Sequence, residues 1–145
     1  SSLCTRGVLM SIRQISVFVQ SKPGHLKRNL DLFQEAGISV RGFSCSDTGD
    51  YGIARFIVDD PERGLAVLQD RGAAVTLTDV VCVELVDKPG ELARVFGVIA
   101  DAGINITYSY SLIATYIAFR VDSPEATEEL LRNEGVRIIE QSELS

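Results

Sequence analysis

The stretch VELVDKPGELARVFGVIADAGINI, residues 83–106, decides the fold because a close copy of it occurs earlier in the chain. Residues 17–40 read VFVQSKPGHLKRNLDLFQEAGISV, and aligning the two stretches superposes Lys22-Pro23-Gly24 on Lys88-Pro89-Gly90. Beyond these stretches the similarity continues in a slightly different register. A repeat of this length indicates one structural unit used twice.

Each copy has the pattern of four strands and two helices. Runs rich in β-branched and apolar residues predict strands: residues 15–20, 38–46, 51–58 and 74–78 in copy one, and 80–86, 104–112 and 136–141 in copy two. The repeat places the remaining strand of copy two after the hairpin at 111–116. After the first strand, Leu26, Leu30 and Phe33 recur at the spacing of a helix with one buried side. A second helix follows Asp60-Pro61 or Ser123-Pro124, which align in the two copies and place a capping side chain before a helix-starting proline.

The order strand-helix-strand-strand-helix-strand defines the fold class. It predicts an α+β protein of two tandem ferredoxin-like βαββαβ modules, each an antiparallel sheet with its helices on one face. We expect the two sheets to join into a continuous sheet. The predicted boundaries are a leader at 1–12, a first domain at 13–78 and a second at 79–145. Met10 is the expected natural start, which makes the residues before it an added leader.

One hairpin lacks turn chemistry. Between the second and third strands of copy one, residues 47–50 read DTGD, a good turn sequence. Copy two reads SLIATY at 111–116, with no Gly, Asn, Asp or Pro, and is three residues shorter than copy one. We expect that a turn segment is absent from the sequence between Ala114 and Thr115.

Composition excludes several classes of protein. With 46% hydrophobic and 23% charged residues, the chain has the balance of a folded protein. A net charge of −6 without a Lys/Arg cluster disfavours nucleic acid and acidic membranes as partners. No apolar stretch approaches the roughly 20 residues that span a bilayer. The three cysteines (Cys4, Cys45 and Cys82) are odd in number and far apart, which fits a reducing cytosol, and we expect Cys45 and Cys82 to be buried.

A resemblance follows from copy two. Residues 87–92 (DKPGEL), then a helix, then residues 102–106 (AGINI) resemble the ACT domain, a small-molecule sensor module of amino-acid metabolism. Copy one keeps the pattern, with Ser21 and Ser39 in place of Asp87 and Asn105, and the resemblance covers the chain from residue 13 onward. It implies an amino-acid ligand bound at a domain interface by the strand-to-helix turn and these two polar positions.

The residue types suit that ligand. Backbone N–H groups at a helix N-terminus attract a carboxylate, Asp87 offers a carboxylate to an ammonium group, and Asn105 offers both a donor and an acceptor. The candidate ligand-binding residues are Ser21, Pro23, Gly24, His25, Leu26, Ser39, Asp87, Pro89, Gly90, Glu91, Leu92 and Asn105.

Each candidate has a structural alternative. Pro-Gly can simply shape the turn, Asp87 can cap the helix, and Asn105 can satisfy local backbone groups. His25, the only histidine, can be an ordinary surface residue of a helix. Tyr108 and Tyr110 alternate on a strand, where one face can simply pack. Asp87 and Asn105 together favour the ligand over these alternatives.

Catalysis finds little support. No nucleophile has a base and an orienting group, no His/Cys/Asp cluster has metal-ligand spacing, and no glycine-rich phosphate loop follows a strand. We therefore expect no catalytic residue, no metal and no cofactor. The sequence favours a cytoplasmic, allosteric sensor of amino-acid metabolism that binds an amino acid, forms a homodimer and regulates a partner enzyme. The alternative is a ligand-free oligomerisation module that serves as a regulatory subunit.

Overall fold

The chain divides into two units. The computed structural model describes residues 11–47 and 49–145, so residues 1–10 of the leader expected at 1–12 lie outside the described residues. One unit, module one, comprises residues 13–78 and 144–145; the other, module two, comprises residues 11–12 and 79–143. Each is described below by itself.

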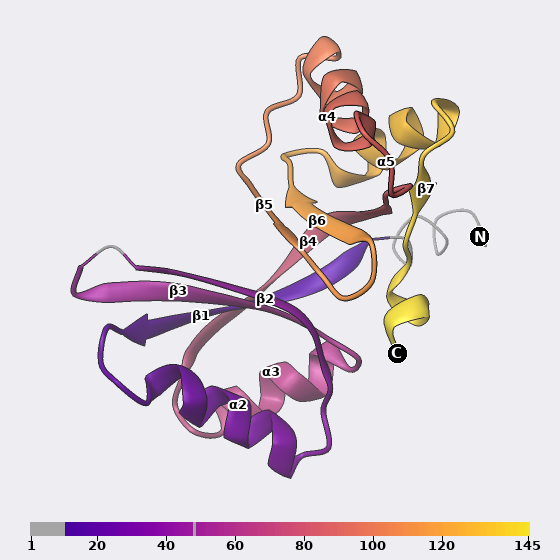
Figure 1. The fold of residues 1–145 in the computed structure, drawn as a ribbon. Coiled ribbons are helices and arrows are strands. Elements are labelled where there is room, and N and C mark those ends of the chain that lie inside the picture. The colour runs from indigo at the N-terminus through magenta and orange to yellow at the C-terminus, as the bar shows by residue number, and fades with distance from the viewer. Residues whose placement is uncertain (1–10, 48) are drawn as a thin grey trace. The chain divides into compact units, whose positions relative to one another are not determined.

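Module one has the predicted βαββαβ order. Its elements are β1 (Ile12–Gln20), α2 (His25–Glu35), β2 (Val40–Asp47), β3 (Tyr51–Val58), α3 (Pro61–Gln69) and the first part of β4 (Ala74–Glu84). The strand order is β2-β3-β1-β4, with β1 and β2 both antiparallel to β3. Figure 1 shows α2 and α3 together on one side of these strands. A ferredoxin-like fold is confirmed for this module.

Module two repeats the arrangement. Its elements are the second part of β4, α4 (Glu91–Asp101), β5 (Tyr108–Ser111), β6 (Tyr116–Arg120), α5 (Pro124–Asn133), β7 (Arg137–Ile138) and a 3-10 helix, η1 (Gln141–Leu144). The strand order is β7-β4-β6-β5, all antiparallel. No helix in the described part of the chain is long and apolar enough to cross a membrane.

Several predicted strands differ from the structure. The strands expected at 74–78 and 80–86 are one strand, β4, because Asp79 between them brings no turn-forming glycine or proline. In β5, only residues 108–111 pair in strand register, instead of 104–112. The last strand stops at Ile138 because the Glu143 carboxylate accepts a hydrogen bond from the Glu140 N–H at 2.8 Å and starts the turn of η1.

A phenylalanine pair lies in each core, and one member of each pair, Phe56 or Phe119, has the equivalent position in the repeat. In module one, the rings of Phe33 and Phe56 meet edge to face with centroids 5.2 Å apart, and both side chains are buried. In module two, Phe96 and Phe119 meet in the same way at 6.0 Å. The helix faces predicted from apolar spacing therefore supply both cores.

Caps and cysteines agree only partly with the sequence prediction. The Asp60 side chain accepts a hydrogen bond from the Arg63 N–H at 3.3 Å, which confirms the cap of α3. Ser123 is the N-cap residue of α5, but its side chain makes no capping bond.

Cys82 is buried, and burial raises the pKa of its thiol to about 12. Cys45 is exposed, so the prediction of burial was wrong for it, because the outer part of edge strand β2 is uncovered.

The hairpin between β5 and β6 closes on apolar residues. The Leu112 N–H donates to the Tyr116 carbonyl at 2.8 Å, and Ala114 takes a left-handed backbone with φ of 57°. That conformation costs energy for any residue with a side chain. The absence of residues between Ala114 and Thr115 stays a prediction.

We expect Gly64→Ala to destabilise the protein by about 1 kcal/mol, although alanine is the better helix former. A Cβ at Gly64 in α3 would lie 2.9 Å from Cδ1 of buried Ile15 and 3.3 Å from a methyl of Val58. The matched control is Gly97→Ala in α4, where a Cβ meets nothing within 4 Å. This control should stabilise the fold by up to about 1 kcal/mol. Urea unfolding of both variants measures the difference, and equal shifts for the two would contradict the packing argument.

Candidate functional site

The strand-to-helix turns of the two modules have the same geometry. Gly24 and Gly90 are the N-cap residues of α2 and α4, with left-handed φ of 89° and 87°. Glycine adopts this conformation without a steric cost. Neither helix receives a capping hydrogen bond from a side chain. The His25 and Glu91 N–H groups donate to the Lys22 and Lys88 carbonyls at 3.4 Å, so an anion would be bound by the N–H groups of the residues that follow, which no side chain caps.

A pocket lies beside the turn of module two. Its volume is about 240 Å³, below the range of drug-sized sites, which suits a small ligand. The turn supplies Asp87 and Lys88, α4 supplies Glu91 and Leu92, and β6 supplies Tyr116. Three candidates from the sequence, Asp87, Glu91 and Leu92, thus line one cavity.

Module one has a pocket at the equivalent place, with a volume of about 280 Å³. The candidates Ser21, Pro23, His25 and Leu26 line it. The alignment of the two copies superposes Ser21 on Asp87 and Leu26 on Leu92. The repeat in sequence is therefore also a repeat of cavities, which we name the turn pockets.

The two acids of the module-two pocket differ in burial and in whether an arginine binds them. Asp87 is exposed and forms no ion pair with the described residues. It does not cap α4, so that alternative was wrong: the N-cap is Gly90. Glu91 is buried, and its two oxygens accept from Arg94 Nε at 3.1 Å and Nη2 at 3.2 Å. The Arg94 hydrogen bond lowers the pKa of Glu91. Asp87 is thus the carboxylate still available to a cationic ligand group.

Module one obtains a carboxylate from a residue that the sequence analysis assigned only to a turn. Asp47, the last residue of β2, lines the turn pocket, and its Oδ2 accepts from the Ser21 hydroxyl at 2.7 Å. Its Oδ1 accepts from the Gly49 N–H at 2.8 Å. The Ser21 bond, then the Gly49 bond, lower the pKa of Asp47. The repeat gave no signal for this residue, because continuing the alignment from the Pro-Gly turns places the apolar Ile113 opposite it.

Other candidates lie outside these cavities. Gly24, Pro89 and Gly90 shape the turns but do not line the turn pockets. Ser39 and Asn105 are exposed and line no turn pocket. The Ser39 N–H donates to the Asp59 carboxylate at 3.0 Å. A role for these two positions in binding stays a prediction.

The strand tyrosines pack on each other. The rings of Tyr108 and Tyr110 stack with centroids 6.5 Å apart on β5. This supports the packing alternative for them. Among residues 11–47 and 49–145, no group of three or more His, Cys, Asp or Glu side chains has the arrangement of a metal site.

Fold and turn together define a class: a tandem pair of ferredoxin-like modules with an open helix N-terminus after a Pro-Gly turn. The sequence profile of the ACT domain pair matches residues 10–145. The chain belongs to this family. No curated protein matches it in sequence.

Solved structures resemble the chain to different degrees. A protein of Bacteroides thetaiotaomicron, BT0572, is 30% identical with a TM-score of 0.88, and the match covers 93% of this chain and 96% of that one. The ligand-free regulatory subunit of aspartate kinase from Thermus thermophilus is 20% identical with a TM-score of 0.64, covering 86% and 93%. The corresponding subunit from Thermus flavus is also 20% identical, with a TM-score of 0.60, covering 86% and 92%. The two kinase subunits share the fold.

Proposed function

We propose that this chain is a regulatory protein that binds a free amino acid in the turn pockets of its ACT modules. The observation that carries the proposal is the pair of equivalent pockets, each with one carboxylate that no arginine binds, near a helix N-terminus that no side chain caps. An amino acid presents a carboxylate to the N–H groups and an ammonium group to the acid. Asp87 has the second role in module two, and Asp47 has it in module one.

The proposal includes a regulatory output. The relatives include regulatory subunits of aspartate kinase, which supports the same kind of task here. We propose a non-catalytic protein of the reducing cytosol that forms a homodimer and acts on a partner enzyme of amino-acid metabolism. Ser39 and Asn105, which line no turn pocket, are proposed to complete the site from a neighbouring module. A ligand changes the regulatory output because its affinity differs between two arrangements of the modules.

A thermal-shift screen against each standard amino acid at millimolar concentration tests the proposal. We expect one amino acid, or a small group of related ones, to raise the melting temperature, because a ligand stabilises the state that binds it. Isothermal titration then gives the affinity and the stoichiometry. Flat melting curves for all of them would overturn the proposal and favour the ligand-free oligomerisation module.

We expect Asp47→Asn to halve the stoichiometry, from two amino acids per chain to one. The variant keeps the size of the side chain but removes the charge that faces the ligand ammonium in module one. Titration calorimetry of the wild type and the variant measures the change. The control is Asp31→Asn, on an exposed ion pair with Lys27, which should leave the stoichiometry at two. An unchanged stoichiometry in Asp47→Asn would show that this carboxylate holds no ligand.

A further inference from the structure

Module one has a second cavity, of about 420 Å³, with different walls. The end of β1, one side of α2, Tyr51 at the start of β3, and residues 71–74 from the turn after α3 to the start of β4 line it, and β2 contributes nothing. We name it the α2 cavity. His25 lines both this cavity and the turn pocket.

The polar wall of the α2 cavity is basic. Arg28 and Arg71 line it, together with His25 and Asn29, and no Asp or Glu does. In the part of the chain that the structure describes, neither arginine forms an ion pair. Both arginines are exposed at the mouth of the cavity, where an anion can reach them. Two uncompensated guanidinium groups at one cavity attract an anion, which they can hold through paired hydrogen bonds.

In module two, the arginine equivalent to Arg28 is already bound by other residues of the protein. Arg94, the counterpart of Arg28, donates to the Glu91 carboxylate and to the Glu134 backbone carbonyl at 3.2 Å. The hydrogen bond to Glu91 and the charges of both glutamates raise the pKa of Arg94. The alignment of the two copies superposes these glutamates on His25 and Arg71. Module one therefore has basic residues in place of both acids around the shared arginine.

One buried position also differs between the two modules. Val95 is a buried core residue of module two. Its counterpart Asn29 is only 8% exposed, lines the α2 cavity, and its Nδ2 donor has no hydrogen-bond partner. An unsatisfied buried donor is unfavourable, so an acceptor supplied by a ligand would offset a cost that the valine never had.

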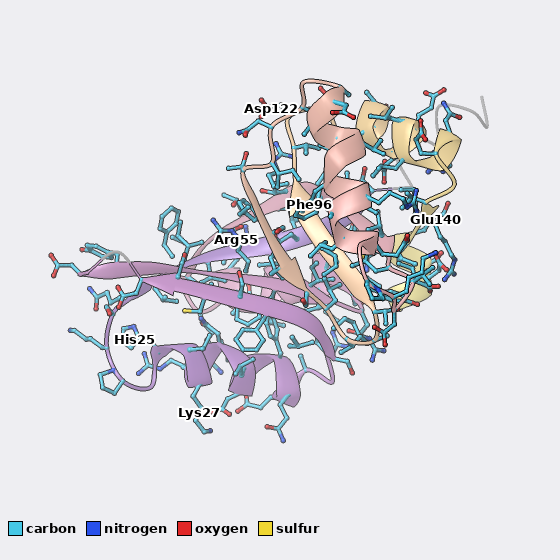
Figure 2. All side chains as sticks on the ribbon, turned by 45° about the horizontal axis from the view of Figure 1, so that its top comes forward. His25, Lys27, Arg55, Phe96, Asp122 and Glu140 are labelled. Atoms are coloured by element: carbon cyan, nitrogen blue, oxygen red, sulfur yellow. The ribbon has the colours of Figure 1, made fainter. Side chains whose placement is uncertain are left out.

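His25 and Lys27 lie on different sides of α2. Figure 2 shows His25 on the side of α2 that faces the strands and Lys27 pointing away from them. Lys27 is paired with Asp31 at 2.9 Å. His25, which lines the cavity, thus lies on a different side of the helix from the ion pair of Lys27 with Asp31.

We propose that the α2 cavity binds a small metabolite through an oxyanion group, a carboxylate or a phosphate. Arg28 and Arg71 bind the oxygens, the Asn29 amide donates to them, and the apolar side chains of β1 and α2, such as Val17 and Leu32, contact the body of the ligand. Module one would then respond to a second, acidic effector besides the amino acid. This site is absent from module two, where Glu91 and Glu134 occupy the equivalent positions.

Titration calorimetry with inorganic phosphate, succinate and uncharged succinamide tests the proposal. We expect phosphate or succinate to bind, and succinamide not to bind at 10 mM; whichever anion binds identifies the source of the oxyanion. Arg28→Gln and Arg71→Glu should each weaken that binding at least tenfold. Lys27→Gln, on the outer side of the same helix, should change it less than twofold. Asp47→Asn, in the turn pocket of module one, should not weaken it, which separates this site from the neighbouring turn pocket that shares His25.

Two results would overturn the proposal. One is the absence of binding for both anions at 10 mM while circular dichroism shows a folded chain. The other is equal weakening by Lys27→Gln and Arg28→Gln, which indicates diffuse attraction by surface charge instead of a cavity.

Discussion

Asp87→Asn is expected to lower the affinity of module two for its amino-acid ligand by about ten- to a hundredfold, the usual effect of losing one charge-assisted hydrogen bond. Asp87 is the one acid lining that pocket that is not already held by an arginine, since Glu91 binds Arg94 through both oxygens. Its removal leaves the ligand ammonium without an anionic partner. Titration calorimetry with the amino acid found by thermal shift measures the loss.

The control for this variant is Asp101→Asn. Asp101 is an exposed acid at the end of α4 and lines no turn pocket, so its removal changes the net charge equally. We expect affinity within about twofold of the wild type. If Asp87→Asn and Asp101→Asn weaken binding equally, the effect comes from net charge, and the proposed contact with Asp87 is wrong.

Glu128→Gln is expected to stabilise the protein above neutral pH. Glu128 is 1% exposed on α5 and one of its oxygens accepts from the Ser11 hydroxyl at 3.2 Å, while the other has no partner. Burial is the main cause that raises its pKa from 4.5 to about 7; Glu125 and Asp79 add to the rise, while Ser11 and Arg132 oppose it. Figure 1 shows α5, on which this acid lies, beside α4.

Proton binding to Glu128 determines the direction in which stability changes with pH. Between pH 4.5 and about 7 the folded chain keeps a proton on Glu128 that the unfolded chain has lost, so stability falls as pH rises through this window. Glutamine does not titrate. At pH 8 the variant should therefore be more stable by an amount on the order of 3 kcal/mol, and near pH 4 the difference should vanish.

Urea unfolding at several pH values measures this effect. The control is Glu129→Gln, the exposed neighbour on the same helix, for which we expect a change within about 0.5 kcal/mol at every pH. A gain for Glu128→Gln that is the same at pH 4 and pH 8 would show that the carboxyl does not carry the shifted titration.

The repeat shows why Glu128 is unusual. The alignment of the second helices of the two copies superposes it on Leu65, which packs against the core of module one. Module two therefore has a carboxyl at a position where module one has an apolar side chain. Sequence alone did not reveal this, because in a helix of mostly polar residues a glutamate normally faces water.

Much of the fold was predictable because its signals are local. The Pro-Gly turns place a glycine where the backbone is left-handed, and apolar spacing gave the buried faces of α2 and α4. Asp60 before Pro61 marked the start of α3. The errors were at strand ends, as with β4 and β5, where pairing with a neighbouring strand and not local propensity sets the length.

The candidate site was predictable only in part. Asp87, Glu91 and Leu92 stand close in sequence around one turn, and the structure brings them to one pocket. Asp47 was missed because it reaches Ser21, far away along the chain, through the pairing of β2 and β1 with β3. No pattern along the chain reports such a contact.

The sequence by itself determined that this protein is a duplicated βαββαβ unit of the ACT family, because turns, caps and apolar periodicity depend on residues a few positions apart. The tertiary structure decided which charges are free. It gave module one the carboxylate of Asp47, and it brought Arg28 and Arg71, which form no ion pair with the described residues, to one cavity. The physical reason is that electrostatic interaction depends on distance in space, and sheet pairing and helix packing alone set the distances between residues far apart in sequence.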